Sequence, residues 1–167
     1  MEAKELLLMS LEHSQGYLAK ALDGLTQKEI AWKPKNECNS IAFILWHVAR
    51  VEDYFVNRVI LHGKEMYETD GWQEKLGTPV KAYQYTTEEL QAWPVPKLGV
   101  LDEYAKSVRT KTMSFINSIS NDKLSEMPRP DRSNDSIGTV LCSLSTEVAL
   151  HVGQIAYLRG VQRGLDT

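Results

Sequence analysis

The last third of the sequence holds a carboxylate and an imidazole at a spacing that suits metal binding. Glu147 and His151 are four residues apart within an apolar helical pattern, so both lie on one helix face with Cβ atoms roughly 5–6 Å apart. Neither group is easily buried unless it is paired or binds a metal. Zn²⁺ and similar ions take imidazole nitrogen and carboxylate oxygen as ligands. The spacing therefore suggests two ligands of one divalent cation.

His47 is the candidate for a third ligand. Among the four histidines, it alone lies both in the middle of another long helical pattern and beside the apolar stripe of that helix. Helical bundles build metal sites from side chains on facing helices. Three protein ligands leave one position for water or substrate, which is typical of a catalytic site. The alternative is an ordinary helix ion pair between Glu147 and His151, with a hydrogen-bonded histidine at position 47.

Three further side chains lie close to these candidates on the same helix faces. Arg50 and Tyr54 follow His47 by about one and two turns, where they could meet an anionic substrate or cofactor; a solvated arginine and a packing tyrosine are the alternatives. Gln154 shares the face of His151 and is either a hydrogen-bond partner of a ligand or a packing residue. No separate general base can be assigned from the sequence, so a group bound to the metal is the expected reactive group.

Four long amphipathic helices are expected to position these residues. Apolar residues recur every three to four positions over residues 3–23, 41–61, 98–119 and 137–160. Ser40 and Ser136 are good N-caps for two of them, and Thr26 and Thr86 begin capping boxes of two short helices. Residues 64–98 are otherwise irregular. We predict an all-α protein, a four-helix bundle that forms one domain over residues 1–167.

Composition excludes several classes of protein. The 167 residues have a net charge of −3, which argues against a nucleic-acid partner, because phosphate binding needs clustered Lys and Arg. No apolar stretch reaches the roughly 20 residues of a membrane span, and the acidic N-terminus does not resemble a signal peptide. Two cysteines are too few for a disulfide framework. We expect a cytoplasmic protein that acts on a small molecule.

The segment Asn39–Asp53, with its central His47, and the pattern Glu147-x-x-x-His151-x-Gly153-Gln154 resemble the DinB/YfiT-like family over nearly the whole chain. The resemblance implies a down-up-up-down bundle, a homodimer, and a metal site for Zn²⁺ first and Ni²⁺ second. The usual ligands of that family are three histidines, one on the second helix and two on the fourth. Here Glu147 replaces the first histidine of the pair, as in the branch with mycothiol-dependent maleylpyruvate isomerases.

The resemblance therefore implies a metal-dependent S-transferase or isomerase that uses a low-molecular-weight thiol as cosubstrate. Two alternatives remain open. A hydrolase that uses metal-bound hydroxide would need the same three ligands, and a dimeric metal- or small-molecule-binding protein would need no reaction. From the ligand types alone, the metal is Zn, Ni, Fe or Mn.

Overall fold

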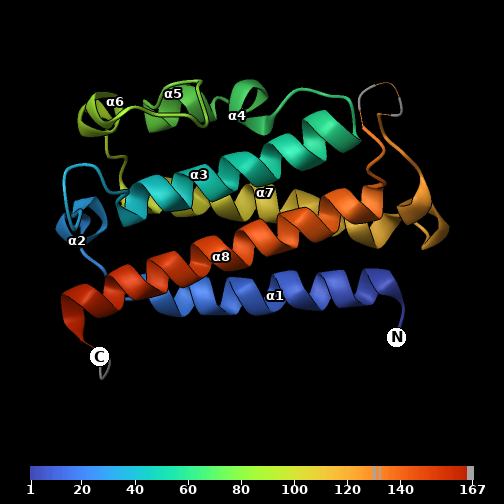
Figure 1. Ribbon diagram of the computed structural model, residues 1–167, viewed down its shortest axis with the longest axis horizontal. Helices are drawn as coiled ribbons and strands as arrows, with labels where there is room; N and C mark the ends of the chain where they lie inside the picture. The colour runs from blue at the N-terminus through green and yellow to red at the C-terminus, as the bar shows by residue number, and fades with distance from the viewer. Residues whose placement is uncertain (130, 132, 165–167) are drawn as a thin grey trace.

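Four long helices form a bundle in the computed structural model, which describes residues 1–129, 131 and 133–164. The long elements are α1 (Ala3–Leu22), α3 (Ile41–Asp53), α7 (Leu98–Ser118) and α8 (Ile137–Arg163). Figure 1 shows α1 and α8 running in one direction and α3 and α7 in the other, which is the down-up-up-down arrangement. No strand occurs within the described ranges. The all-α prediction is confirmed.

The predicted starts of the helices agree closely with the observed starts where a capping residue marks them. Ser40 Oγ accepts a hydrogen bond from Phe43 N, and Ser136 Oγ accepts one from Thr139 N. The predicted capping boxes are present at the starts of α2 (Gln27–Ala31) and α6 (Thr87–Ala92). At the other end, α8 continues to Arg163, three residues beyond the predicted end at 160. Residues 130, 132 and 165–167 belong to the predicted loop and domain end and lie outside the described residues.

The second long helix is more complex than predicted. It was expected to run uninterrupted over 41–61, but regular α-helix ends at Asp53 and a π-helical segment, η1 (Tyr54–Ile60), continues it. The Asn57 amide donates to Asp53 Oδ1 at 2.7 Å, and Gly63 N donates to Asn57 O at 2.8 Å. Apolar periodicity does not distinguish a π turn from an α turn over so short a stretch.

Residues 64–97 form a layer over the outer side of α3 (Figure 1). This region contains α4 (Met66–Thr69) and α5 (Trp72–Leu76), which the sequence did not indicate, as well as the predicted α6. The layer explains why α3 is buried on nearly all sides rather than along one stripe. A 3₁₀ turn, η2 (Asp122–Ser125), interrupts the loop before α8.

The bundle core lies where α3 meets α7 and α8, and where α8 meets α1. Its largest fully buried side chains include Trp46 on α3, Tyr104 on α7 and Leu144 on α8. None of the helices in the described part is long and apolar enough to cross a bilayer. The cytoplasmic location stays a prediction.

Candidate functional site

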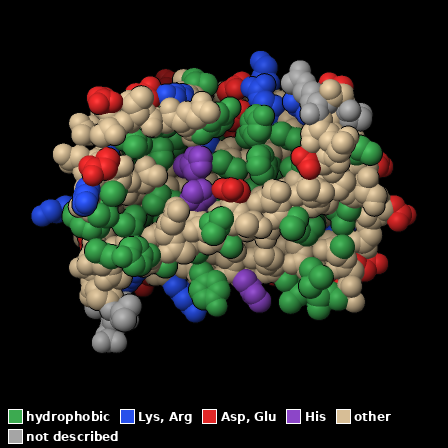
Figure 2. Space-filling model, in the orientation of Figure 1, with side chains coloured by type: hydrophobic (Ala, Val, Ile, Leu, Met, Phe, Trp, Pro, Cys, Tyr) green, Lys and Arg blue, Asp and Glu red, His purple; other side chains and the backbone are tan. Residues whose placement is uncertain are grey.

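The three predicted ligands come together at the surface junction of α3 and α8. The rings of His47 and His151 lie with centroids 5.0 Å apart and planes at 85°. Glu147 Oε2 is 3.4 Å from His151 Nε2. A pair of adjoining histidine side chains beside an acidic one is visible in the middle of the face in Figure 2. Two helices far apart in sequence therefore place all three side chains within one small region.

Both histidines are fixed through the same ring nitrogen. His47 Nδ1 lies 2.9 Å from Ala82 O, and His151 Nδ1 lies 2.8 Å from Gln154 Oε1. A carbonyl oxygen only accepts, so each Nδ1 carries the proton and donates it. In the neutral form of His47, Nε2 then carries the lone pair. An oxygen acceptor behind the ring is the usual arrangement for a histidine that ligates a metal.

The surroundings of His47 favour its neutral form. Burial lowers the pKa of His47 from its ordinary value, with the nearby His151 contributing in the same direction. The hydrogen bond to Ala82 and the charge of Glu147 act in the opposite direction and are outweighed. A neutral imidazole is the form that donates a lone pair to a cation.

The three side chains are of types that bind metals and lie close together, but they are not arranged around a metal position. Within residues 1–129, 131 and 133–164, no three or more His, Cys, Asp or Glu side chains are already arranged to hold a metal ion. The Glu147 side chain is 42% exposed. The two imidazoles and one carboxylate form a donor set suited to Zn²⁺.

A cavity of about 640 Å³ opens beside the histidines, and both His47 and Glu147 line it. Its outer side is an irregular segment, residues 78–85, which we call the strap. Arg50 Nη1 donates to Val80 O at 3.1 Å, and His47 Nδ1 donates to Ala82 O. His47 and Arg50 lie three residues apart on α3, and they bind the carbonyl groups of two strap residues, Ala82 and Val80, that are two positions apart. The strap is thus attached to the same helix face that carries the first candidate ligand.

Tyr67 fixes the start of the strap from α4. Its hydroxyl is 2.7 Å from Thr78 O, 2.8 Å from Thr78 Oγ1 and 3.1 Å from Pro79 O. The Arg50 guanidinium lies over the Tyr67 ring, 3.6 Å from its centroid. Arg50 therefore links the aromatic ring, the strap and the helix.

Arg50 and Tyr54, the predicted cofactor-binding residues on α3 and η1, both line the cavity but differ in exposure. Arg50 is only 3% exposed, and its Nη2 donates to Glu65 Oε2 at 2.8 Å. Tyr54 is 36% exposed at the cavity mouth. Gln154 has its predicted place beside His151. Contact of these three residues with a cofactor or substrate stays a prediction.

Sequence reasoning missed Glu65 and the strap. Glu65 is 5% exposed and receives hydrogen bonds from both Arg50 and Arg58. The strap contributes through main-chain oxygens at Val80 and Ala82, which every residue type possesses. No side-chain pattern could have identified those acceptors.

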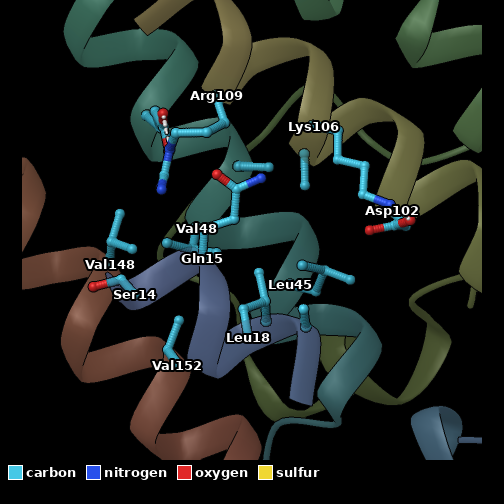
Figure 3. A pocket seen from close by; sticks show the side chains of 14 residues that line it. Ser14, Gln15, Leu18, Leu45, Val48, Asp102, Lys106, Arg109, Val148 and Val152 are labelled. Atoms are coloured by element: carbon cyan, nitrogen blue, oxygen red, sulfur yellow. Dashed lines mark hydrogen bonds and ion pairs between the residues drawn. The ribbon is translucent and has the colours of Figure 1, made fainter. Parts of the chain in front are cut away.

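A second, smaller cavity lies inside the bundle on another side of α3 and α8. It has a volume of about 80 Å³ and lies between α1, α3, α7 and α8. Figure 3 shows apolar side chains such as Val48 and Val152 around it, with Arg109 at one end. Arg109 makes a two-pronged ion pair with Glu52, with both N–O distances 2.8 Å. The size and lining suit bundle packing rather than a substrate.

The remaining histidines and the cysteines lie elsewhere. His13 on α1 and His62 after η1 are both exposed. Cys142 is exposed on α8, and Cys38 is half-buried in the loop before α3; both are free thiols. None of the four residues lines the large cavity.

Comparisons with known proteins agree with this architecture. A family model described as Mycothiol-S-transferase matches residues 6–164. A solved structure, described as "Crystal structure of the conserved protein of locus from Enterococcus faecalis", superposes with a TM-score of 0.86 over 99% of both chains at 21% identity. At that identity the likeness concerns the fold alone. A search of curated proteins gives no match.

Proposed function

The chain belongs to the Mycothiol-S-transferase family, a DinB/YfiT-like family, and from this membership we propose that it is a metal-dependent enzyme that transfers a low-molecular-weight thiol to an electrophile. One observation carries the proposal beyond the family. The rings of His47 and His151 meet 5.0 Å apart beside Glu147, at the edge of the large cavity. Such a donor set next to an open cavity suits a catalytic site rather than a closed structural one.

In this proposal His47, Glu147 and His151 hold the metal, with Zn²⁺ the first candidate and Ni²⁺ the second. A divalent ion bound there would supply the Lewis acidity that keeps a thiol ionised at neutral pH. Ala82 O and Gln154 Oε1 lie within hydrogen-bond distance of Nδ1 of the two histidines, which supports Nε2 as the ligating nitrogen of each in this proposal. The cavity then admits the electrophile next to the thiol.

The proposed transfer needs no further cofactor, because its proton, bonds and electron pairs are all accounted for. The thiol loses its proton to water, its sulfur forms a bond to the electrophilic carbon, and the leaving group departs with the bonding electron pair. An isomerase would differ only in that the same thiol adds reversibly and then leaves. The chain's own contribution is to bind and orient the two reactants, which lowers the entropic part of the barrier.

Metal analysis of matched histidine variants tests the ligand assignment. Protein purified without a histidine tag should contain about one divalent metal per chain. His47→Ala and His151→Ala should lose that metal but keep the helical circular dichroism spectrum. His13→Ala removes an exposed histidine of α1 and should retain the metal, which makes it the control. Stoichiometric metal in His151→Ala would refute the ligand set.

Thiol dependence tests the reaction class. Turnover of an electrophile should rise with added thiol and disappear after chelation. Chelation should also lower the melting temperature, because a ligand bound only by the folded state stabilises it. Activity that is indifferent to thiol would instead indicate a hydrolase, and substoichiometric metal with an unchanged melting temperature would indicate a non-catalytic binding protein.

We also propose that the protein is a homodimer. Leu150, Tyr157 and Val161 form one stripe on the outer side of α8 and are 59%, 72% and 51% exposed. Their spacing of seven and then four residues keeps them on one helix face. A contiguous apolar stripe on a surface helix supports association with a second copy.

A further inference from the structure

The charged side chains around the large cavity are occupied by one another. Arg58 Nε lies 3.2 Å from Glu65 Oε1, and Arg58 Nη2 lies 2.9 Å from Glu68 Oε1. Arg50 is paired with the same Glu65 at 2.8 Å. On the strap, Lys81 is paired with Glu89 at 2.6 Å. Because each cation already faces a carboxylate, the ionic groups offer little unmatched charge to a ligand.

The apolar side chains of the same cavity are in the opposite situation. Tyr54 on η1 and Val80 and Tyr83 on the strap are 36%, 52% and 61% exposed, yet all three line the cavity. We call the two tyrosines, Tyr54 and Tyr83, the aromatic wall. Large apolar groups exposed together at one cavity mark a binding surface more often than they mark packing.

The aromatic wall is not among the anchors of the strap. The strap is attached through Tyr67, Arg50 and His47, which all bind its main-chain oxygens. Neither the Tyr54 nor the Tyr83 hydroxyl makes a hydrogen bond within the described residues. Removing either ring would therefore leave the anchors of the strap in place.

We propose that the aromatic wall binds an apolar, ring-bearing group of the electrophile, and that Tyr54 and Tyr83 determine specificity for it. This inference rests on the proposed transferase function, and it adds the chemical class of the second substrate. The rings contribute through stacking and burial of apolar surface, so their hydroxyl groups are not required. The cavity of about 640 Å³ is large enough for a monocyclic electrophile beside a thiol.

Two chlorides with the same displacement chemistry test the inference. Benzyl chloride carries a ring, whereas chloroacetamide does not. In both reactions the thiol proton goes to water, a sulfur–carbon bond forms, and chloride leaves with the electron pair of the broken carbon–chlorine bond. For each variant we divide kcat/KM for benzyl chloride by kcat/KM for chloroacetamide, and then divide this ratio by the wild-type ratio. The different intrinsic reactivities of the two chlorides cancel in the result.

We expect Tyr83→Ala and Tyr54→Ala each to lower this ratio about 3- to 10-fold, which is the range for loss of one aromatic contact. Tyr83→Phe and Tyr54→Phe keep the ring and should match the wild type. Tyr17→Ala, which removes a tyrosine that is 65% exposed on α1, is the control and should also match. An equal fall in kcat/KM for both chlorides in the alanine variants, or no fall for either, would overturn the inference.

Binding of a non-reactive analogue separates the inference from the proposed function. Benzyl alcohol, titrated into metal-free protein, should shift the amide NMR signals of the strap, and Tyr83→Ala should weaken its dissociation constant about 3- to 10-fold. If the wild type turns over neither chloride with any thiol, the transferase proposal fails. The titration still tests whether the aromatic wall binds a ring-bearing molecule. Unchanged affinity in Tyr83→Ala would refute the aromatic wall as a binding surface.

Discussion

The two histidines of the candidate site show how local hydrogen bonds decide which ring atom is available for chemistry. His47 and His151 each donate from Nδ1 to a carbonyl oxygen, one from the main chain and one from Gln154. The identities of the candidate residues were accessible from sequence because Glu147 and His151 obey helical spacing. The acceptor of His47 was not, because Ala82 O is a main-chain atom brought in by tertiary structure.

The half-buried His47 should make the metal-free protein sensitive to acid. Burial lowers the pKa of His47 from its ordinary value of 6.5, so the unfolded chain takes up a proton here at a pH where the folded chain does not. The free energy of unfolding therefore falls as the pH falls below about 6.5, and His47 contributes no pH dependence above that value.

Urea unfolding of chelator-treated protein measures this effect. Between about pH 6.5 and pH 5, the unfolding midpoint of the wild type should drop further than that of His47→Gln, which has no group to titrate. Parallel pH profiles for the two proteins would contradict a lowered pKa for the half-buried His47.

At the scale of elements, the buried carboxylate of Asp53 organises the layer above α3. Asp53 is fully buried and accepts hydrogen bonds from the main-chain amides of Met66 and Tyr67, from Asn57 Nδ2 and from the Tyr104 hydroxyl. The two amides belong to the first turn of α4, so Asp53 fixes the start of that short helix. Tyr67 in turn fixes the strap through Thr78.

Replacing Asp53 should therefore loosen the layer as well as lower stability. Asp53→Asn puts an NH₂ group where a carboxylate oxygen accepts hydrogen bonds, so buried donors lose their partner. We expect the free energy of unfolding to fall by about 2–4 kcal/mol, as when one member of a buried polar network is removed. Urea unfolding gives this value, and hydrogen exchange should show faster exchange in residues 65–85.

Asp102→Asn is the matched control for this substitution. Asp102 pairs with Lys106 on the surface of α7 at 2.6 Å, with the lysine side chain 64% exposed. Removal of an exposed pair of this kind should change the free energy of unfolding by less than about 1 kcal/mol. Equal losses in the two variants would mean that Asp53 has no special organising role.

The same elements show where prediction from sequence ends. Long helices were recognised because their apolar residues repeat over several turns and because Ser40 and Ser136 mark their starts. By contrast, α4 and α5 have only four and five residues, too few for a periodic pattern. The start of α4 depends on Asp53, a residue 13 positions earlier, so no local signal specifies it.

At the scale of the whole molecule, the bundle leaves the outer side of α8 without a partner within the described chain. If the homodimer forms through Leu150, Tyr157 and Val161, a charge on this stripe should separate the two copies. Sedimentation equilibrium should give twice the chain mass for the wild type, and Tyr157→Glu should shift the equilibrium towards one chain.

The control for the dimer is Met127→Glu, which adds the same charge at a site that is 52% exposed in the loop before α8. That variant should sediment like the wild type. A single-chain mass for the wild type, or no change on Tyr157→Glu, would refute this dimer surface.

Attachment of the strap by its carbonyl groups has a consequence for how such bundles diversify. Positions 80 to 83 contribute main-chain oxygens to the scaffold at Val80 and Ala82, so the side chains at Val80 and Tyr83 are free to change while those bonds persist. Exchange of this tetrapeptide between homologous proteins should alter substrate preference without re-engineering of the helices. The helices thus hold the strap through its main chain and leave these two side chains outside that attachment.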